Sequence, residues 1–110
     1  MIAYTVIAVF EDARVAEEWI AWLRDEHLAE VCAAGALDAE VIRMDPPDST
    51  PPETRVRCEV RYHFSSREAF NSYVRDHAPL LRAEGLKHFP PERGVTYERS
   101  LGAVVFTLSR

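Results

Sequence analysis

The chain has little cysteine and little glycine. Its two cysteines, Cys32 and Cys58, lie far apart and lack the close spacing of paired zinc ligands. We expect them to be reduced thiols that fill the core, and we expect no metal or other cofactor. With only four glycines, the sequence contains no glycine-rich phosphate-binding loop, and no nucleophile motif is present either.

Long apolar runs and an excess of positive charge are also missing. No apolar stretch approaches the length of a membrane span, and the N-terminus lacks a signal-type pattern, so we expect a cytoplasmic protein with no membrane partner. The formal net charge of −5 disfavours nucleic acid as a partner, because nucleic acids bind basic surfaces. The composition, with 47% hydrophobic residues, is typical of one globular domain covering residues 1–110.

One motif occurs twice in the chain. Residues 19–27 and residues 70–77 each carry two spaced aromatic residues, an Arg-Asp pair and a histidine. In both copies a glycine, Gly35 or Gly85, lies eight residues after the histidine. The repeat predicts two similar halves, each containing one helix that ends at its glycine.

Six elements are expected from the pattern of apolar residues. They are a strand over 2–10, a helix from Asp12 to about Ala34, a strand over 36–44, a strand over 55–64, a helix from Ser65 to about Glu84, and a strand over 95–108. Ser65 with Glu68 resembles a capping box, and Pro79 should kink or open the second helix. Residues 45–54 contain four prolines and are expected to form a loop between two strands.

This order of elements predicts an α+β fold of the ferredoxin-like βαββαβ type. Its four-stranded antiparallel sheet would carry two helices on one face, with the first and third strands in the centre. The final strand can divide at Gly102 into an extra C-terminal strand. The apolar side chains of Thr5, Ile7, Val9 and residues 103–108 would then lack cover, which predicts a homodimer through the open sheet face, a dimeric α/β barrel.

Two groups of residues are candidates for a site. His27, Glu30 and His77 fall on the apolar faces of the two helices, so they form either a cluster for proton transfer or metal binding, or ordinary core histidines. On the strand over 55–64, the polar face carries Arg57, Glu59, Arg61 and His63. These residues could hold a small anion between the two sheets of a dimer, or they could form a ladder of ion pairs.

The segments that carry the most specific pattern resemble a known family. They are Glu26-His27-Leu28 with Glu30-Val31 and Gly35, Ser66-Arg67-Glu68 with Phe70, and His77-Ala78-Pro79 with Leu81-Arg82, Glu84-Gly85 and Phe89. The pattern, over roughly residues 1–100, is similar to a family of short bacterial proteins of unknown function in the dimeric α/β-barrel superfamily. The resemblance implies the ferredoxin-like fold and the dimer, and it brings no catalytic residues with it.

Three functions remain open on the sequence alone. The first is a homodimer that binds a small, anionic ligand between its sheets through Arg57, Arg61 and His63. The second is a structural or regulatory dimer that acts through a protein partner, with the proline-rich loop as one contact. The third is a small enzyme of the cofactor-independent monooxygenase or isomerase type, in which His27 or His77 is the general base.

Overall fold

The computed structural model describes residues 1–46 and 55–110, and its centre is a four-stranded sheet. The strands are β1 (Ile2–Phe10), β2 (Asp38–Arg43), β3 (Val56–Phe64) and β4 (Val95–Ala103). Their order is β2-β3-β1-β4, and each neighbouring pair is antiparallel. This topology confirms the predicted ferredoxin-like fold with β1 and β3 in the centre. Most of the expected loop over 45–54 lies outside the described residues.

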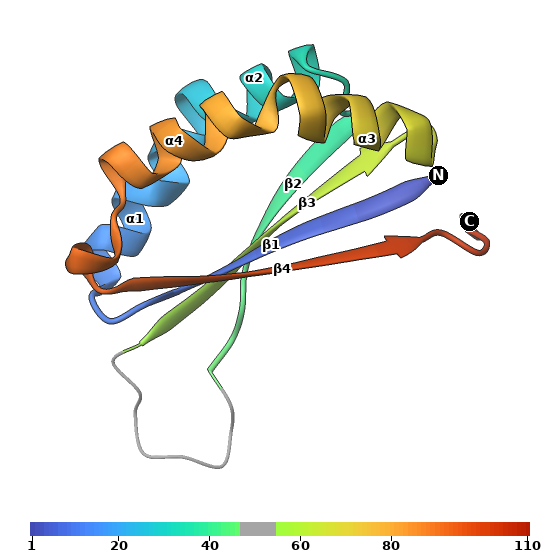
Figure 1. Cartoon of the computed structure of the whole chain (residues 1–110). Helices are drawn as coiled ribbons and strands as arrows, with labels where there is room; N and C mark the ends of the chain where they lie inside the picture. The colour runs from blue at the N-terminus through green and yellow to red at the C-terminus, as the bar shows by residue number, and fades with distance from the viewer. Residues whose placement is uncertain (47–54) are drawn as a thin grey trace.

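All helices cover the same side of the sheet (Figure 1). They are α1 (Ala13–Trp22), α2 (Leu28–Ala33), α3 (Arg67–Asp76) and α4 (Ala78–His88), with a π-helical turn η1 (Leu23–His27) and a 3₁₀ turn η2 (Pro91–Arg93). None of the described helices has the length and apolar character needed to cross a membrane. We call the sheet surface turned away from the helices the open face.

Side chains cap the first turns of α1 and α3. Asp12 caps α1 by accepting a hydrogen bond from the backbone N–H of Arg14 at 2.8 Å. The cap of α3 is Ser66, whose hydroxyl accepts from the N–H of Ala69 at 3.1 Å. The prediction of Ser65 was wrong by one residue, and the capping box is absent because the third helical position is Ala69, which has no acceptor side chain.

Both predicted helices are interrupted, each for its own reason. In the first, the N–H of Leu28 donates to the carbonyl of Leu23, five residues back, which inserts the π turn between α1 and α2. In the second, Pro79 cannot donate to a helical ladder, and His77 leaves helical geometry at φ −127° and ψ −39°. The kink at Pro79 is therefore confirmed, whereas the π turn was not foreseen.

The two repeated glycines have different roles. Gly35 follows the first helix with a φ of +130°, a conformation that L side chains rarely adopt. Gly85 instead lies inside α4, where a Cβ atom would sit 3.6 Å from the ring of Trp22. The prediction that the second helix ends at Gly85 was wrong, because α4 continues to His88, and a Cβ atom at position 85 would make only an ordinary van der Waals contact with the indole.

Alternation along the strands separates the core from the open face. On β3, Cys58, Val60, Tyr62 and Phe64 are buried against the helices, as their spacing predicted. The C-terminal strand β4 is present but ends at Ala103, shorter than the expected 95–108, and residues 104–110 are not in a strand. The backbone N–H of Val104 donates to the carbonyl of Met1 at 2.9 Å, and beyond it Val105, Phe106 and Leu108 are 83–90% exposed.

Candidate functional site

A small cavity lies between the helices and the sheet of the single chain. Its volume is about 60 Å³, and residues from both layers line it. The walls are mainly aromatic, contributed by Tyr4, Trp19, Trp22, Tyr62, Tyr73 and Tyr97. We call this space the interlayer cavity. It lies on the opposite side of the sheet from the anion site expected at the open face.

Two arginines converge on one buried hydroxyl at the interlayer cavity. Tyr4, on β1, is only 4% exposed. Its hydroxyl oxygen accepts from Arg82 Nη2 at 3.3 Å and from Arg99 Nε at 3.1 Å. Arg82 comes from α4, and Arg99 comes from β4, opposite Val6 on the face that meets the helices. Both arginines are exposed in part and line the cavity.

Among the residues that the structure describes, these two guanidinium groups have no acidic partner. Within the described residues, no ion pair joins Arg82 or Arg99 to a carboxylate. The nearby tyrosines stay protonated, because burial raises the pKa of Tyr73 and of Tyr97 to about 12, and the arginines only partly offset that rise. The cavity therefore combines two positive groups with neutral hydroxyls, an arrangement suited to an anion.

The Tyr4 hydroxyl has one further bond to make. A hydroxyl has two acceptor lone pairs and one donor proton, and the two arginines occupy the acceptor side. No described residue accepts the proton. An anion bound here would accept a hydrogen bond from the Tyr4 O–H group and would also contact the two guanidinium groups.

His27 is the other polar group on the cavity wall. It belongs to the π turn η1 and stacks on Trp22, with ring centroids 4.4 Å apart and planes at 19°. Its Nδ1 atom is buried and has no hydrogen-bond partner among the described residues. Leaving such an atom unpaired costs about 1–3 kcal/mol. Burial also lowers the pKa of His27 to about 4, so its imidazole is neutral near pH 7.

The predicted cluster of His27, Glu30 and His77 does not form. Glu30 and His77 are exposed and line a separate shallow groove between α2 and α4, away from His27. The prediction that both histidines face the core was wrong for His77, because the break before Pro79 places Ala78 in the buried position. Glu30 turns outward because the π turn changes the helix phase, so that Val31 takes the buried position.

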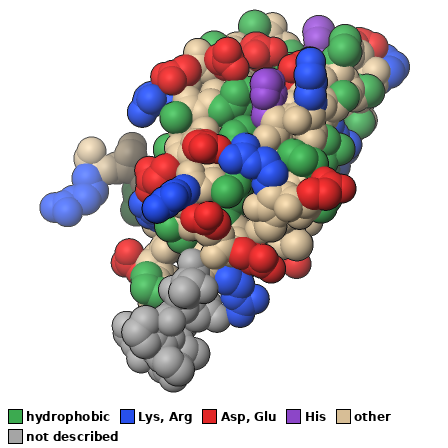
Figure 2. Space-filling view, turned by 90° about the vertical axis from the view of Figure 1, so that its left-hand side faces the viewer, with side chains coloured by type: hydrophobic (Ala, Val, Ile, Leu, Met, Phe, Trp, Pro, Cys, Tyr) green, Lys and Arg blue, Asp and Glu red, His purple; other side chains and the backbone are tan. Residues whose placement is uncertain are grey.

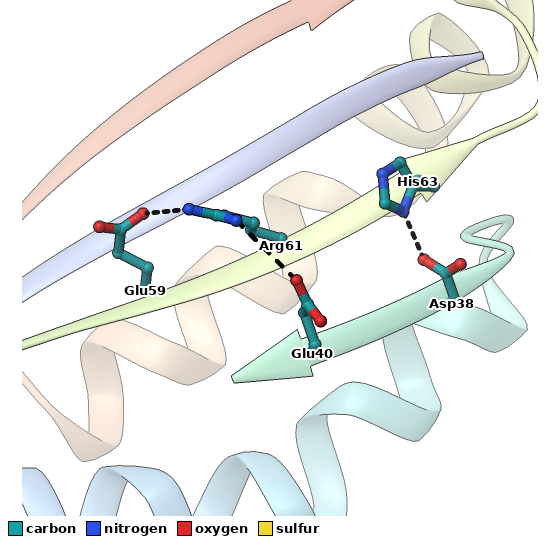
Figure 3. Close-up of polar contacts among 5 residues, drawn as sticks. All are labelled: Asp38, Glu40, Glu59, Arg61 and His63. Carbon is teal, nitrogen blue, oxygen red and sulfur yellow. Dashed lines mark hydrogen bonds and ion pairs between the residues drawn. The ribbon is translucent and has the colours of Figure 1, made fainter. Parts of the chain in front are cut away.

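The four polar residues predicted on β3 do share the open face. Arg61 lies 3.5 Å from Glu59 and 4.0 Å from Glu40, and Arg57 lies 3.7 Å from Glu59. His63 Nδ1 lies 2.7 Å from a carboxylate oxygen of Asp38, directly across the β2–β3 pair. Figure 3 shows most of these side chains linked along the two strands. We call this set of contacts the ion-pair ladder.

The ion-pair ladder contains carboxylates beside its arginines, unlike the interlayer cavity. Arg57 and Arg61 each face a carboxylate, His63 meets Asp38, and Glu59 is itself buried, with 7% exposure. This geometry favours the structural reading of the ladder over a ligand site, although the ligand role of Arg57, Arg61 and His63 stays a prediction. No group of three or more His, Cys, Asp or Glu side chains in the described part of the chain is arranged to hold a metal ion.

Charges elsewhere on the molecule are mixed. Figure 2 shows acidic and basic side chains interspersed over one end of the molecule, with apolar side chains between them. At the surface, Arg24 pairs with Asp25, and Arg75 pairs with Asp76, so these arginines also face carboxylates. The described residues on the face that Figure 2 shows therefore form no broad basic patch.

Sequence reasoning missed the two arginines of the interlayer cavity. The signal for Arg99 was present, because it shares strand parity with Val95 and Tyr97 and so must face the helices. The position of Arg82 depends on the kink at Pro79, which a helical wheel drawn over one continuous helix does not reproduce.

Known proteins share this architecture. A family model described as "Domain of unknown function (DUF4286)" matches residues 1–104. Among solved structures, a dimeric ferredoxin-like protein from an uncultured marine organism has a TM-score of 0.71 at 15% identity, with 97% of each chain covered. HapK from Hahella chejuensis has a TM-score of 0.65 at 18% identity, covering 100% of this chain and 98% of that one.

An oxygenase is also among the similar structures. SnoaB from Streptomyces nogalater, described as a cofactor-independent oxygenase, has a TM-score of 0.59 at 17% identity, with 98% of each chain covered. At these identities the similarity establishes the fold alone. No curated protein sequence matches the chain.

The unpaired imidazole predicts a pH dependence of stability. The pKa of His27 falls from 6.5 to about 4 on burial, so the unfolded chain takes up the proton first. The resulting decrease in the free energy of unfolding is absent above about pH 6.5 and grows as the pH falls, reaching roughly 2–3 kcal/mol near pH 4. Between pH 7 and pH 4.5, the free energy of unfolding measured with urea should fall by about 2 kcal/mol less in His27→Phe than in the unmodified protein. His77→Gln is the control and should keep the original slope; an unchanged slope in His27→Phe contradicts the assignment.

Proposed function

We propose, from the premise that this chain belongs to the DUF4286 family of unknown function, that it binds a small organic anion in the interlayer cavity of each subunit of a homodimer. The observation that carries the proposal is the meeting of Arg82 and Arg99 at the hydroxyl of Tyr4 without a carboxylate. Arginine binds carboxylates through paired N–H donors, and the free Tyr4 proton adds a third donor.

The size of the interlayer cavity limits the ligand. A volume of about 60 Å³ corresponds to roughly two water molecules, whereas a cavity that admits benzene measures about 150 Å³. A carboxylate with two or three carbon atoms fits this space best. A larger ligand requires the exposed side chains of Arg82 and Arg99 to swing outward.

The enzyme alternative is supported less well. The similar structure of a cofactor-independent oxygenase and the placement of His27 on the cavity wall favour it. Pockets for drug-sized ligands measure about 300–1,000 Å³, well above the interlayer cavity. A short anion therefore fits the interlayer cavity as it stands, whereas turnover of a large substrate would require the cavity to enlarge.

The second candidate site is the one expected from the sequence, an anion held between two sheets by Arg57, Arg61 and His63. In its favour, the contact of Arg57 to Glu59 is long, at 3.7 Å, and a two-fold axis would double the cations. Against it, an incoming anion would compete with the carboxylates of the ion-pair ladder. A protein-interaction role through the proline-rich loop depends on residues outside the described part of the chain.

The homodimer is proposed from uncovered apolar surface. The open face presents Thr5, Ile7 and Val9 from the central strand, and Val105 and Phe106 follow β4 in the exposed C-terminal segment. A second copy stacked on this face would cover the strand and enclose the ion-pair ladder, whose charges are already paired. Two similar structures described as dimeric support this arrangement.

Acetate binding tests the site. We expect calorimetry to detect acetate at millimolar concentration, and Arg99→Gln to weaken it about 10- to 100-fold because a charged hydrogen bond is removed. Arg57→Gln is the matched control on the open face and should bind acetate normally. Loss of binding in Arg57→Gln with normal binding in Arg99→Gln would transfer the site to the space between the sheets.

Light scattering after gel filtration tests the dimer. We expect twice the chain mass at micromolar concentration, and a monomer for Ile7→Lys, because the new ammonium group would lose water against the partner's sheet. Leu80→Lys changes a leucine that is 74% exposed on the helical side and should stay dimeric. A monomeric unmodified chain would exclude the dimer and leave the interlayer cavity, which lies within one chain, unaffected.

A further inference from the structure

Besides Tyr4 and the two arginines, the imidazole of His27 is a polar group that lines the interlayer cavity. The stack on Trp22 fixes the plane of its ring, and the neighbouring π turn fixes its backbone. π turns occur frequently at functional sites, where they reposition one side chain. Within the described residues, the side chain of His27 makes no hydrogen bond, and its Nδ1 atom is buried.

A neutral imidazole offers one donor and one acceptor. Burial lowers the pKa of His27 to about 4, so the ring is in this neutral form at physiological pH. A carboxylate can only accept a hydrogen bond, and an ammonium group can only donate one. A hydroxyl does both, so it can pair with the ring in either tautomer.

We propose that His27 binds a ligand hydroxyl, so that the interlayer cavity selects short 2-hydroxy carboxylates over plain carboxylates of equal length. The inference rests on the proposed function, in which Arg82, Arg99 and Tyr4 hold the carboxylate. The small volume of about 60 Å³ requires the hydroxyl to lie close to the carboxylate, which points to the adjacent carbon.

Matched pairs of acids test the selection. Glycolate against acetate, and lactate against propionate, differ by one hydroxyl each. We expect calorimetry to give roughly five- to tenfold tighter binding of the hydroxy acid to the unmodified protein, the value of one neutral hydrogen bond. His27→Phe should bind both acids of a pair equally, with acetate affinity within about twofold of the original. His77→Gln is the matched control from the second copy of the repeat and should keep the preference.

Different results would contradict the role of His27 and the proposed binding of anions. Equal affinity for glycolate and acetate in the unmodified protein, or a preference retained in His27→Phe, overturns the role of His27. Absence of binding by every acid overturns the proposed function itself. If His27→Phe does not fold, nitrogen NMR of the histidine rings replaces it: glycolate, but not acetate, should shift the His27 ring signals, and equal responses to both acids overturn the inference.

Discussion

A single layer of helices covers only one side of the four-stranded sheet, and the other features of the molecule depend on this constraint (Figure 1). Between the two layers, large aromatic side chains leave the interlayer cavity. Outside the layers, the central strand β1 leaves Thr5, Ile7 and Val9 incompletely covered on the open face. The molecule therefore has a cavity suited to a ligand and an open face suited to contact with a second copy of the chain.

The distribution of charge separates these two surfaces. On the open face, the two arginines of β3 face Glu59 and Glu40, and His63 meets Asp38, so a partner that covers this face would not leave either arginine without a carboxylate. In the interlayer cavity, Arg82 and Arg99 meet a neutral hydroxyl instead. Two arginines without a described carboxylate partner, in a chain with a net charge of −5, support the proposed anion site better than the presence of arginine alone does.

The sheet could be predicted from the sequence because side chains alternate along a strand with a fixed period of two. That period assigned β1 and β3 correctly, and it would have assigned Arg99 had it been extended along β4. Helical wheels drawn over one continuous helix failed at each interruption, because the π turn before Leu28 shifts the phase of the residues after it and the break before Pro79 takes His77 out of helical geometry. The errors at Glu30 and His77 both have this origin, whereas His27, inside the π turn, kept its place on the inner wall.

The functional proposals depend on an anion site in the interlayer cavity and not on the open face. Titration of the nitrogen-labelled protein with acetate, followed by amide and arginine side-chain NMR signals, tests it most directly. Binding in the interlayer cavity should give saturating shifts at Arg82 and Arg99, with little change at Arg57 and Arg61. Shifts confined to Arg57 and Arg61, with silent signals at Arg82 and Arg99, would contradict it.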